Sequence, residues 1–232
     1  MHQSLVPPAL REFAAGFRGE VNTIPIDPAK TAHLVVDLQI GFMAEGAFAE
    51  VPVARDVVTN VNRISNVLRK AGGTVIYIQF EVDLNEPLHW GPMYDRMLPE
   101  NRQRFAAAFR KGAEPHKLWP GLDIQAKDLI IAKTRFSAFI PGTCELDTAL
   151  KAKGIDNMIV TGTVSNCCCE STARDALQLG YKVLFVEDAT ASFSDEAHNA
   201  TLANMVRLLF ADVVTVDETI ARIEKAKVSA EL

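Results

Sequence analysis

The chain has 232 residues, of which 48% are hydrophobic and 23% are charged, and its formal net charge is −5. These values are typical of a soluble globular protein of one large domain or at most two small ones. The mild acidity argues against a nucleic-acid-binding protein, and no stretch approaches the roughly 20 apolar residues of a membrane helix. The first residues, MHQSLVPPALREF, lack the apolar core of a signal peptide. We therefore expect a cytoplasmic protein without nucleic-acid or membrane partners.

The cysteines are the one unusual feature of the composition. There are four, and three of them are consecutive: Cys144, Cys167, Cys168 and Cys169. Consecutive cysteines make a poor disulfide framework, so we expect the thiols to be reduced.

Six short apolar runs, rich in β-branched residues, indicate buried strands. In chain order they are His33–Leu38, Gly73–Phe80, Leu129–Ala132, Asn157–Gly162, Tyr181–Asp188 and Asp212–Asp217. Helical patterns lie between them. The clearest is Arg55–Lys70, where apolar residues recur at helical spacing until Gly72 and Gly73 end the pattern. Further helices are expected near Cys144–Lys153, Cys169–Leu179, Ser194–Phe210 and Glu218–Lys227.

Apolar strands that alternate with helices predict an α/β fold. The simplest topology is a three-layer, doubly wound, Rossmann-like arrangement: a mostly parallel six-stranded sheet with helices on both faces. A closed barrel would need eight such units and about 250 residues. We expect residues 1–232 to form a single domain. The least regular stretch, residues 81–121, holds Trp90, Trp119 and five prolines. It is expected to form a lobe or lid containing one helix, Arg102–Arg110.

Three strand ends carry polar residues suited to catalysis. Asp37 ends the first strand, Lys133 follows the third, and the Ser165–Cys169 stretch follows the fourth. Since ligands bind outside the carboxyl ends of the strands in open α/β sheets, these residues should converge at one edge. A thiol becomes an effective nucleophile beside a base or a cation, a carboxylate can take its proton, and a lysine keeps the carboxylate ionised.

Each of these residues also has a structural interpretation. Asp37 could close a turn, Lys133 could be an ordinary lysine at a strand end, and any cysteine could be a small buried apolar residue. Their joint placement is what favours catalysis.

Three segments resemble the isochorismatase-like cysteine hydrolases, a superfamily that includes nicotinamidases, N-carbamoylsarcosine amidohydrolases and ureide hydrolases. They are VVDLQIGF (Val35–Phe42), IAKTRFSAFIPGT (Ile131–Thr143) and TGTVSNCCCESTARDALQLGYKVLFVEDA (Thr161–Ala189), within a resemblance that covers Ala32 to Val216. The resemblance implies an isochorismatase-like version of the same fold.

The resemblance also implies roles for individual residues. The family places its nucleophile six residues after the glycine that closes the fourth strand, so from Gly162 the count reaches Cys168. The family's carboxylate falls on Asp37 and its lysine on Lys133. A cis peptide is implied at Val164–Ser165, with Ser165 and Cys168 forming the oxyanion hole. Cys167 and Cys169 are then neighbours of the nucleophile, and Cys144 is interpreted as an apolar filler.

The chain departs from two branches of the superfamily. Nicotinamidases carry a metal site after the second strand, with an aspartate and at least two histidines. Here that region offers Glu81, Asp83 and the single His89, so we expect no metal and no other cofactor. True isochorismatases hydrolyse a vinyl ether and lack the nucleophilic cysteine, so Cys168 argues against that reaction.

The resulting hypothesis is a metal-independent cysteine hydrolase that cleaves a C–N bond through an acyl-thioester. Its substrate would be a small carboxamide or ureide of the biuret, triuret or N-carbamoyl type. The alternatives are an isochorismatase-type vinyl-ether hydrolase and a non-catalytic thiol redox or binding protein. The resemblance further implies a homo-oligomer, either a dimer or a tetramer. Candidate substrate-binding residues, each of which could equally belong to the core or to a solvated surface, are Phe42, Trp90, Tyr94, Arg135, Phe136 and Phe139.

Overall fold

Six strands form one sheet in the computed structural model, which describes residues 1–19, 23–85 and 90–230. The strand order is β3-β2-β1-β4-β5-β6, and every neighbouring pair is parallel. The strands are β1 (Thr31–Val36), β2 (Thr74–Phe80), β3 (Leu129–Lys133), β4 (Asn157–Thr163), β5 (Lys182–Ala191) and β6 (Asp212–Val214). The predicted α/β class and six-stranded sheet are confirmed, and this sheet is wholly parallel.

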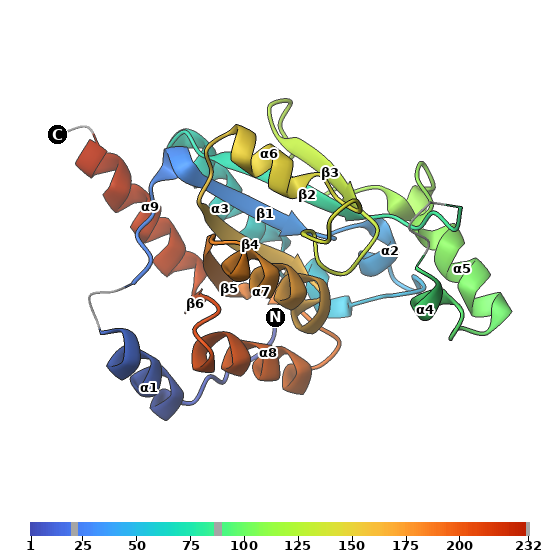
Figure 1. Ribbon diagram of the computed structural model, residues 1–232, viewed down its shortest axis with the longest axis horizontal. Helices are drawn as coiled ribbons and strands as arrows, with labels where there is room; N and C mark the ends of the chain where they lie inside the picture. Colours follow the sequence, from blue (N-terminus) through green and yellow to red (C-terminus); the bar gives the residue numbers. More distant parts are fainter. Residues whose placement is uncertain (20–22, 86–89, 231–232) are drawn as a thin grey trace.

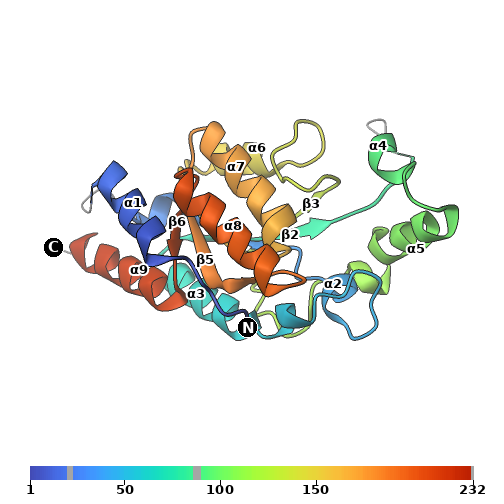
Figure 2. The ribbon, with the colours of Figure 1, turned by 90° about the horizontal axis from the view of Figure 1, so that it is seen from below.

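Helices cover both faces of the sheet, as the doubly wound topology requires (Figures 1 and 2). One face packs against α3 (Val58–Lys70) and α9 (Val216–Ala230). The other packs against α6 (Leu146–Ala152), α7 (Glu170–Gln178) and α8 (Asp195–Arg207), with α1 (Pro8–Arg18) lying along α8. The predicted three layers are therefore confirmed.

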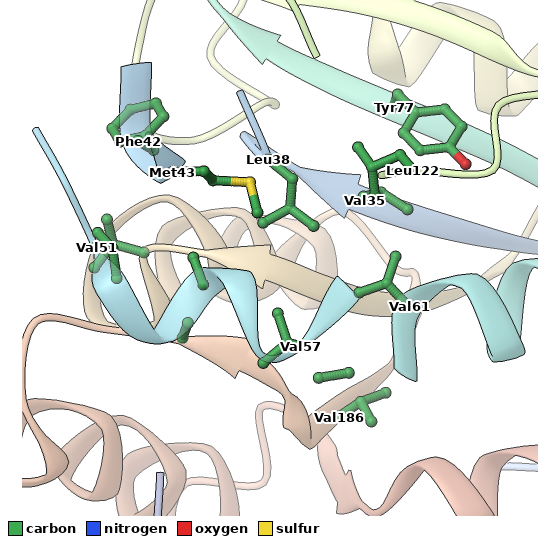
Figure 3. Packing of buried hydrophobic residues seen from close by; sticks show 14 of the residues in the cluster. Val35, Leu38, Phe42, Met43, Val51, Val57, Val61, Tyr77, Leu122 and Val186 are labelled. Carbon is green, nitrogen blue, oxygen red and sulfur yellow. The ribbon is translucent and has the colours of Figure 1, made fainter. Parts of the chain in front are cut away.

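Alternation along the strands divides the core into two clusters. Val35 and Tyr77 face α3, whereas Leu34 and Ile76 face the opposite layer, because successive side chains of a strand point to opposite faces. Figure 3 shows Val61 of α3 between the ribbon of that helix and the strands, beside Val35 and Val186. Burying one such side chain stabilises the fold by about 1.5–3 kcal/mol.

Several element boundaries differ from the predictions. The helical pattern predicted from Arg55 becomes α3 only at Val58, because Pro52–Arg55 forms a separate 3₁₀ turn. The predicted strand Asp212–Asp217 stops at Val214, since α9 already begins at Val216. Three helices were not predicted: α1, α2 (Ile40–Met43) and α4 (Gly91–Tyr94). In the described residues, no helix has the length and apolarity to cross a bilayer.

The described residues of this stretch, 81–85 and 90–121, extend beyond the carboxyl ends of the strands, where α4 and α5 (Pro99–Phe109) lie (Figure 1). Its helix starts three residues earlier than predicted, because Pro99 occupies the first turn, where its missing N–H costs nothing. Phe105 and Phe109 of α5 pack on Phe80 at the end of β2, with ring centroids 5.7 and 5.4 Å away. Aromatic contacts thus join this stretch to the sheet.

Gly162 allows β4 to approach β1 closely. Its φ is 109°, and a Cβ there would lie 2.1 Å from the carbonyl oxygen of Val36. An L side chain is strained at this φ and would collide with backbone that cannot move aside. Because Val36 precedes Asp37, this contact sets the distance between the two strand ends that carry Asp37 and the cysteine triplet.

We expect Gly162→Ala to lower the free energy of unfolding by at least ~3 kcal/mol, through the combined cost of backbone strain and overpacking. Urea denaturation measures the change. The matched control is Gly16→Ala in α1, where a Cβ would meet nothing within 4 Å. This control should be neutral or slightly stabilising, and equal effects at the two positions would contradict the close-packing argument.

A buried histidine also joins β1 to its neighbours. His33 lies 2.9 Å through Nδ1 from the Ser65 hydroxyl and 2.8 Å through Nε2 from the Thr161 hydroxyl. Complete burial, assisted by the nearby charge of Arg69, lowers the pKa of His33 to about 3. As the pH falls, the imidazole therefore stays neutral in the folded protein at pH values where it is already protonated in the unfolded chain.

This shift predicts acid sensitivity of a definite sign. Between pH 6.5 and about 3 the unfolded state binds a proton at His33 and the folded state does not, so stability falls as the pH falls. The contribution of His33 is about 1.4 kcal/mol per pH unit. We expect His33→Gln to reduce the slope of unfolding free energy against pH by about that amount between pH 4 and 6. Parallel slopes for the two proteins would contradict the assignment.

Candidate active site

Asp37 leaves β1 in a left-handed conformation, with φ of 52° and a fully buried side chain. Its amide donates to the carbonyl of Ile78 at 3.0 Å, and its own carbonyl accepts from the amide of Gln39 at 2.8 Å. Aspartate tolerates this region better than most residues. The turn places the carboxyl group at the carboxyl end of the sheet.

Lys133, the last residue of β3, holds its ammonium group against that carboxylate. Nζ lies 2.8 Å from Oδ2 of Asp37, and both side chains are 0% exposed. Nζ also donates to the carbonyl of Arg135 at 3.0 Å and lies 4.9 Å from the centroid of the Phe80 ring. A carboxylate, a carbonyl and an aromatic face thus replace the water that the ammonium loses on burial.

The third group comes from a π-helical turn, Ser165–Cys169, between β4 and α7. The carbonyl of Val164 accepts from the amides of Cys167 at 3.0 Å and Cys169 at 3.2 Å. Cys168, on the same turn, is buried, and it lies close enough to Asp37 and Lys133 that their charges act on its thiol. The structure thereby brings Asp37, Lys133 and Cys168 together at one edge of the sheet.

The predicted position of the cis peptide was wrong by one residue. The cis bond joins Thr163 and Val164, not Val164 and Ser165. β4 continues through Thr163, so the change of direction into the turn begins at Val164.

Burial and charge together determine the protonation of the group. Burial raises the pKa of Asp37, and the positive charge of Lys133 opposes that rise. Burial alone favours a neutral amine, but the negative charge of Asp37 and the nearby Cys168 raise the pKa of Lys133 above its ordinary value. A hydrogen bond with Cys167, together with burial, raises the pKa of Cys168 well above its ordinary value. Cys168 is therefore a protonated thiol around neutral pH.

The other cysteines have distinct surroundings. Cys167 is half-buried, and its hydrogen bond with Cys168 lowers its pKa. The buried Sγ of Cys169 faces the carbonyl of Thr161 at 3.9 Å. Cys144 pairs with Lys133 in an isolated antiparallel bridge, and burial raises its pKa to about 11.

Four of the six candidate substrate-binding residues form a cluster near Lys133. The Trp90 ring meets Phe136 edge-on at 4.8 Å, and the guanidinium of Arg135 lies 5.1 Å from the centroid of a Trp90 ring. Tyr94, almost fully buried, meets Trp90 edge-on at 6.2 Å. Because the backbone carbonyl of Arg135 binds Nζ of Lys133, this cluster is adjacent to the ion pair.

The other two candidates lie apart from each other. Phe42 packs on Phe109 at 4.5 Å in the core cluster of α3 and α9. Phe139 packs on Tyr181 at 5.5 Å in the cluster on the opposite face. Both side chains are 7% exposed. Phe42 shares its cluster with Tyr94, and Trp90 packs against that cluster, whereas Phe136 packs against the cluster that holds Phe139.

Gln39 was missed by the sequence analysis, although it lies within the VVDLQ segment. Its buried side-chain Nε2 donates to the carbonyls of Phe80 at 3.0 Å and His116 at 2.8 Å, and its Oε1 accepts from the amide of Phe80 at 2.8 Å. The residue therefore fixes the end of β2 beside Lys133. A polar residue directly after a buried strand was the available signal.

The candidate metal-ligand region has a different arrangement. Nε2 of His116 lies 3.5 Å from Oε2 of Glu81, and Asp83 accepts from the amide of Asn85 at 2.8 Å. His89 lies outside the described residues. Within the described part of the chain, no three His, Cys, Asp or Glu side chains are grouped so that they could hold a metal ion.

Comparison with known proteins identifies the family. Residues 31–218 match the family of the Isochorismatase domain. The chain belongs to this family. Ureidoacrylate amidohydrolase RutB of Rhizobium rhizogenes is 31% identical over 217 residues, covering 88% of this chain and 87% of RutB. The uncharacterized isochorismatase family protein YwoC of Bacillus subtilis is 33% identical over 183 residues, covering 78% of this chain and 88% of YwoC.

Solved structures give the same result. A cysteine hydrolase from Pseudomonas syringae pv. phaseolicola is 30% identical with a TM-score of 0.77, covering 88% of this chain and 96% of that one. N-carbamoylsarcosine amidase from Thermoplasma acidophilum is 26% identical with a TM-score of 0.65, covering 81% and 97%. The predicted resemblance is confirmed, and the chain is a cysteine hydrolase of the isochorismatase family.

The buried ion pair generates a testable coupling. We expect Lys133→Met and Asp37→Asn each to lower the unfolding free energy by about 3 kcal/mol, because each leaves one buried charge without its partner. The double variant should lose clearly less than the sum of the two losses. Urea denaturation of the four proteins gives the coupling energy, and additive losses would show that the two groups do not act as a pair.

Proposed function

We propose that the protein is a metal-independent cysteine hydrolase that cleaves a C–N bond of a small carboxamide or ureide. The observation that carries the proposal is the placement of a buried thiol, Cys168, near a buried carboxylate, Asp37, whose charge is matched by Lys133 at 2.8 Å. RutB and N-carbamoylsarcosine amidase, both amidohydrolases by name, support it.

The first chemical step follows from the protonation states. Asp37 takes the proton of Cys168, and the thiolate attacks the carbonyl carbon of the substrate. Because burial raises the pKa of Asp37, this carboxyl group is a stronger base than an exposed aspartate. The carbonyl oxygen becomes an oxyanion, for which we assign the backbone amides of Ser165 and Cys168 as donors.

Two further steps complete the cycle. Asp37 gives its proton to the leaving nitrogen, the C–N bond breaks, and ammonia or an amine departs from an acyl-thioester on Cys168. Water, deprotonated by Asp37, then attacks the thioester and restores the thiol. Lys133 remains an ammonium throughout, since its pKa is raised, and it limits the build-up of negative charge.

The cluster around Trp90 indicates the substrate class. Flat aromatic faces at Trp90 and Phe136 suit a planar carbamoyl or ureide group, and the guanidinium of Arg135 suits a carbonyl or an anionic substituent. We therefore propose substrates of the biuret, triuret or N-carbamoyl type. Tyr94 supports the Trp90 ring, whereas Phe42 and Phe139 would act through the core behind the site. We also expect the protein to work as a homodimer or homotetramer.

The test is ammonia release from a panel of ureidoacrylate, N-carbamoylsarcosine, biuret, triuret and maleamate. We expect Cys168→Ala to reduce turnover of the best substrate by at least ~10³-fold, because the covalent route is lost. Cys167→Ala is the matched control, one residue away on the same turn, and should retain most of the activity.

Added hydroxylamine should intercept the acyl-thioester as a hydroxamate, and dialysis against EDTA should leave the rate unchanged. Loss of activity in Cys167→Ala but not in Cys168→Ala would overturn the assignment of the nucleophile. Hydrolysis of isochorismate that survives Cys168→Ala would replace amide hydrolysis with vinyl-ether chemistry.

A further inference from the structure

Ser165 opens the turn that carries Cys168, and its side chain contacts α8. Its hydroxyl lies 2.9 Å from Nδ1 of His198, a residue of α8. Both side chains are completely buried, so the bond is shielded from water. The orientation of Ser165 is therefore set by a helix that contributes no group to the Asp37–Lys133–Cys168 arrangement.

His198 is in turn held by a second imidazole from the N-terminal segment. The rings of His2 and His198 stack with centroids 4.6 Å apart and an angle of 20° between their planes. Nδ1 of His2 lies 2.6 Å from Oδ1 of Asp195, and Nε2 accepts from the amide of Ser192 at 2.9 Å. The same nitrogen lies 3.2 Å from the carbonyl of Ser192, so the Ser192–Asp195 segment holds the His2 ring through both of its nitrogens.

The Ser192 segment that holds His2 also contacts Asn166, the next residue of the turn. The hydroxyl of Ser192 donates to Oδ1 of Asn166 at 2.7 Å. Asn199 of α8 anchors the segment that bears His2, since its Oδ1 accepts from the amide of Leu5 at 2.6 Å and its Nδ2 donates to the carbonyl of Gln3 at 3.0 Å. Figure 2 shows this segment running from α1 along α8 to the N-terminus.

We propose that His198 is a positioning residue for acylation: it orients Ser165, and through it the amides of Ser165 and Cys168, and stacking by His2 holds it in place. The inference rests on the proposed function, because it concerns the oxyanion donors of that reaction. Such donors stabilise an oxyanion only when they already point at it, and small displacements reduce the rate steeply. Burial and the neighbouring His2 lower the pKa of His198 to about 4, so the ring stays neutral around neutral pH.

Two probes separate oxyanion stabilisation from thiol reactivity without the natural substrate. p-Nitrophenyl acetate acylates a thiolate through an oxyanion: the sulfur–carbonyl bond forms, the ester C–O bond breaks, and p-nitrophenolate is released. Iodoacetamide alkylates the same thiolate by displacement of iodide, with no oxyanion. All proteins carry Cys167→Ala, so that this neighbouring thiol does not contribute to the measured reaction of Cys168. Alkylation of Cys168 is followed as loss of the p-nitrophenolate burst.

We expect His198→Ala to slow acylation by about tenfold or more while the alkylation rate stays within about twofold. His198→Asn, whose amide can reach the position of Nδ1, should recover much of the loss. His2→Ala should slow acylation severalfold by removing the stacking ring from outside the core. Met205→Leu, a buried change of similar volume on the same helix, is the matched control and should leave both rates unchanged.

A double-variant cycle tests the route of the effect. If His198 acts through Ser165, the Ser165→Ala/His198→Ala protein should acylate no more slowly than the slower single variant. Multiplicative losses would overturn the proposal. So would equal slowing of acylation and alkylation, or an effect of Met205→Leu as large as that of His198→Ala.

Two controls keep the outcomes distinct. Labelling of the buried Cys169 would show that a variant has unfolded, and the comparison then rests on His198→Asn and His2→Ala. If Cys168 of the parent protein reacts with neither probe, the proposed function fails rather than the role of His198.

Discussion

The carboxylate of Asp37 and the ammonium of Lys133 meet 2.8 Å apart with no access to solvent. Removing two charges from water costs several kcal/mol for each ion, and their attraction offsets this cost only where the remaining bonding capacity is satisfied. Much of the surrounding structure serves that purpose. The carbonyl of Arg135 and the ring of Phe80 complete the environment of Lys133, while Gln39 holds the backbone of Phe80 in place.

The strand order explains how two distant segments reach this pair. β1 and β4 are neighbours at the centre of the sheet, where the direction of winding reverses, and a crevice for ligands is expected at that point. Gly162 lets the two strands approach closely just before Asp37 and the turn with Cys168. Lys133 arrives from β3, two strands from β1, and its long side chain spans the end of β2.

The sequence was informative wherever one local rule decided the outcome. Strands were visible as β-branched apolar runs, and Asp37, Lys133 and Cys168 stood out because they follow such runs. Gln39, His198 and His2 were not visible, because their contacts join residues 33 to 196 positions apart. The sequence also did not show that Phe42 and Phe139 lie on opposite faces of the sheet, since an aromatic residue does not encode which face receives it. The cis bond, placed from the resemblance, was expected one residue too late.

Lys133 belongs to the outermost strand on its side of the sheet. β3 pairs with β2 along one edge only, two of its five residues are exposed, and its outer edge is bridged by Cys144 at Lys133 itself. Outer strands with few buried contacts open at lower free energy than the centre of a sheet. Fraying of β3 would withdraw the counter-charge from Asp37 while β1 and β4 remained paired. The free energy of opening β3 at the edge of the sheet, rather than that of unfolding its centre, therefore limits the stability of the Asp37–Lys133 pair.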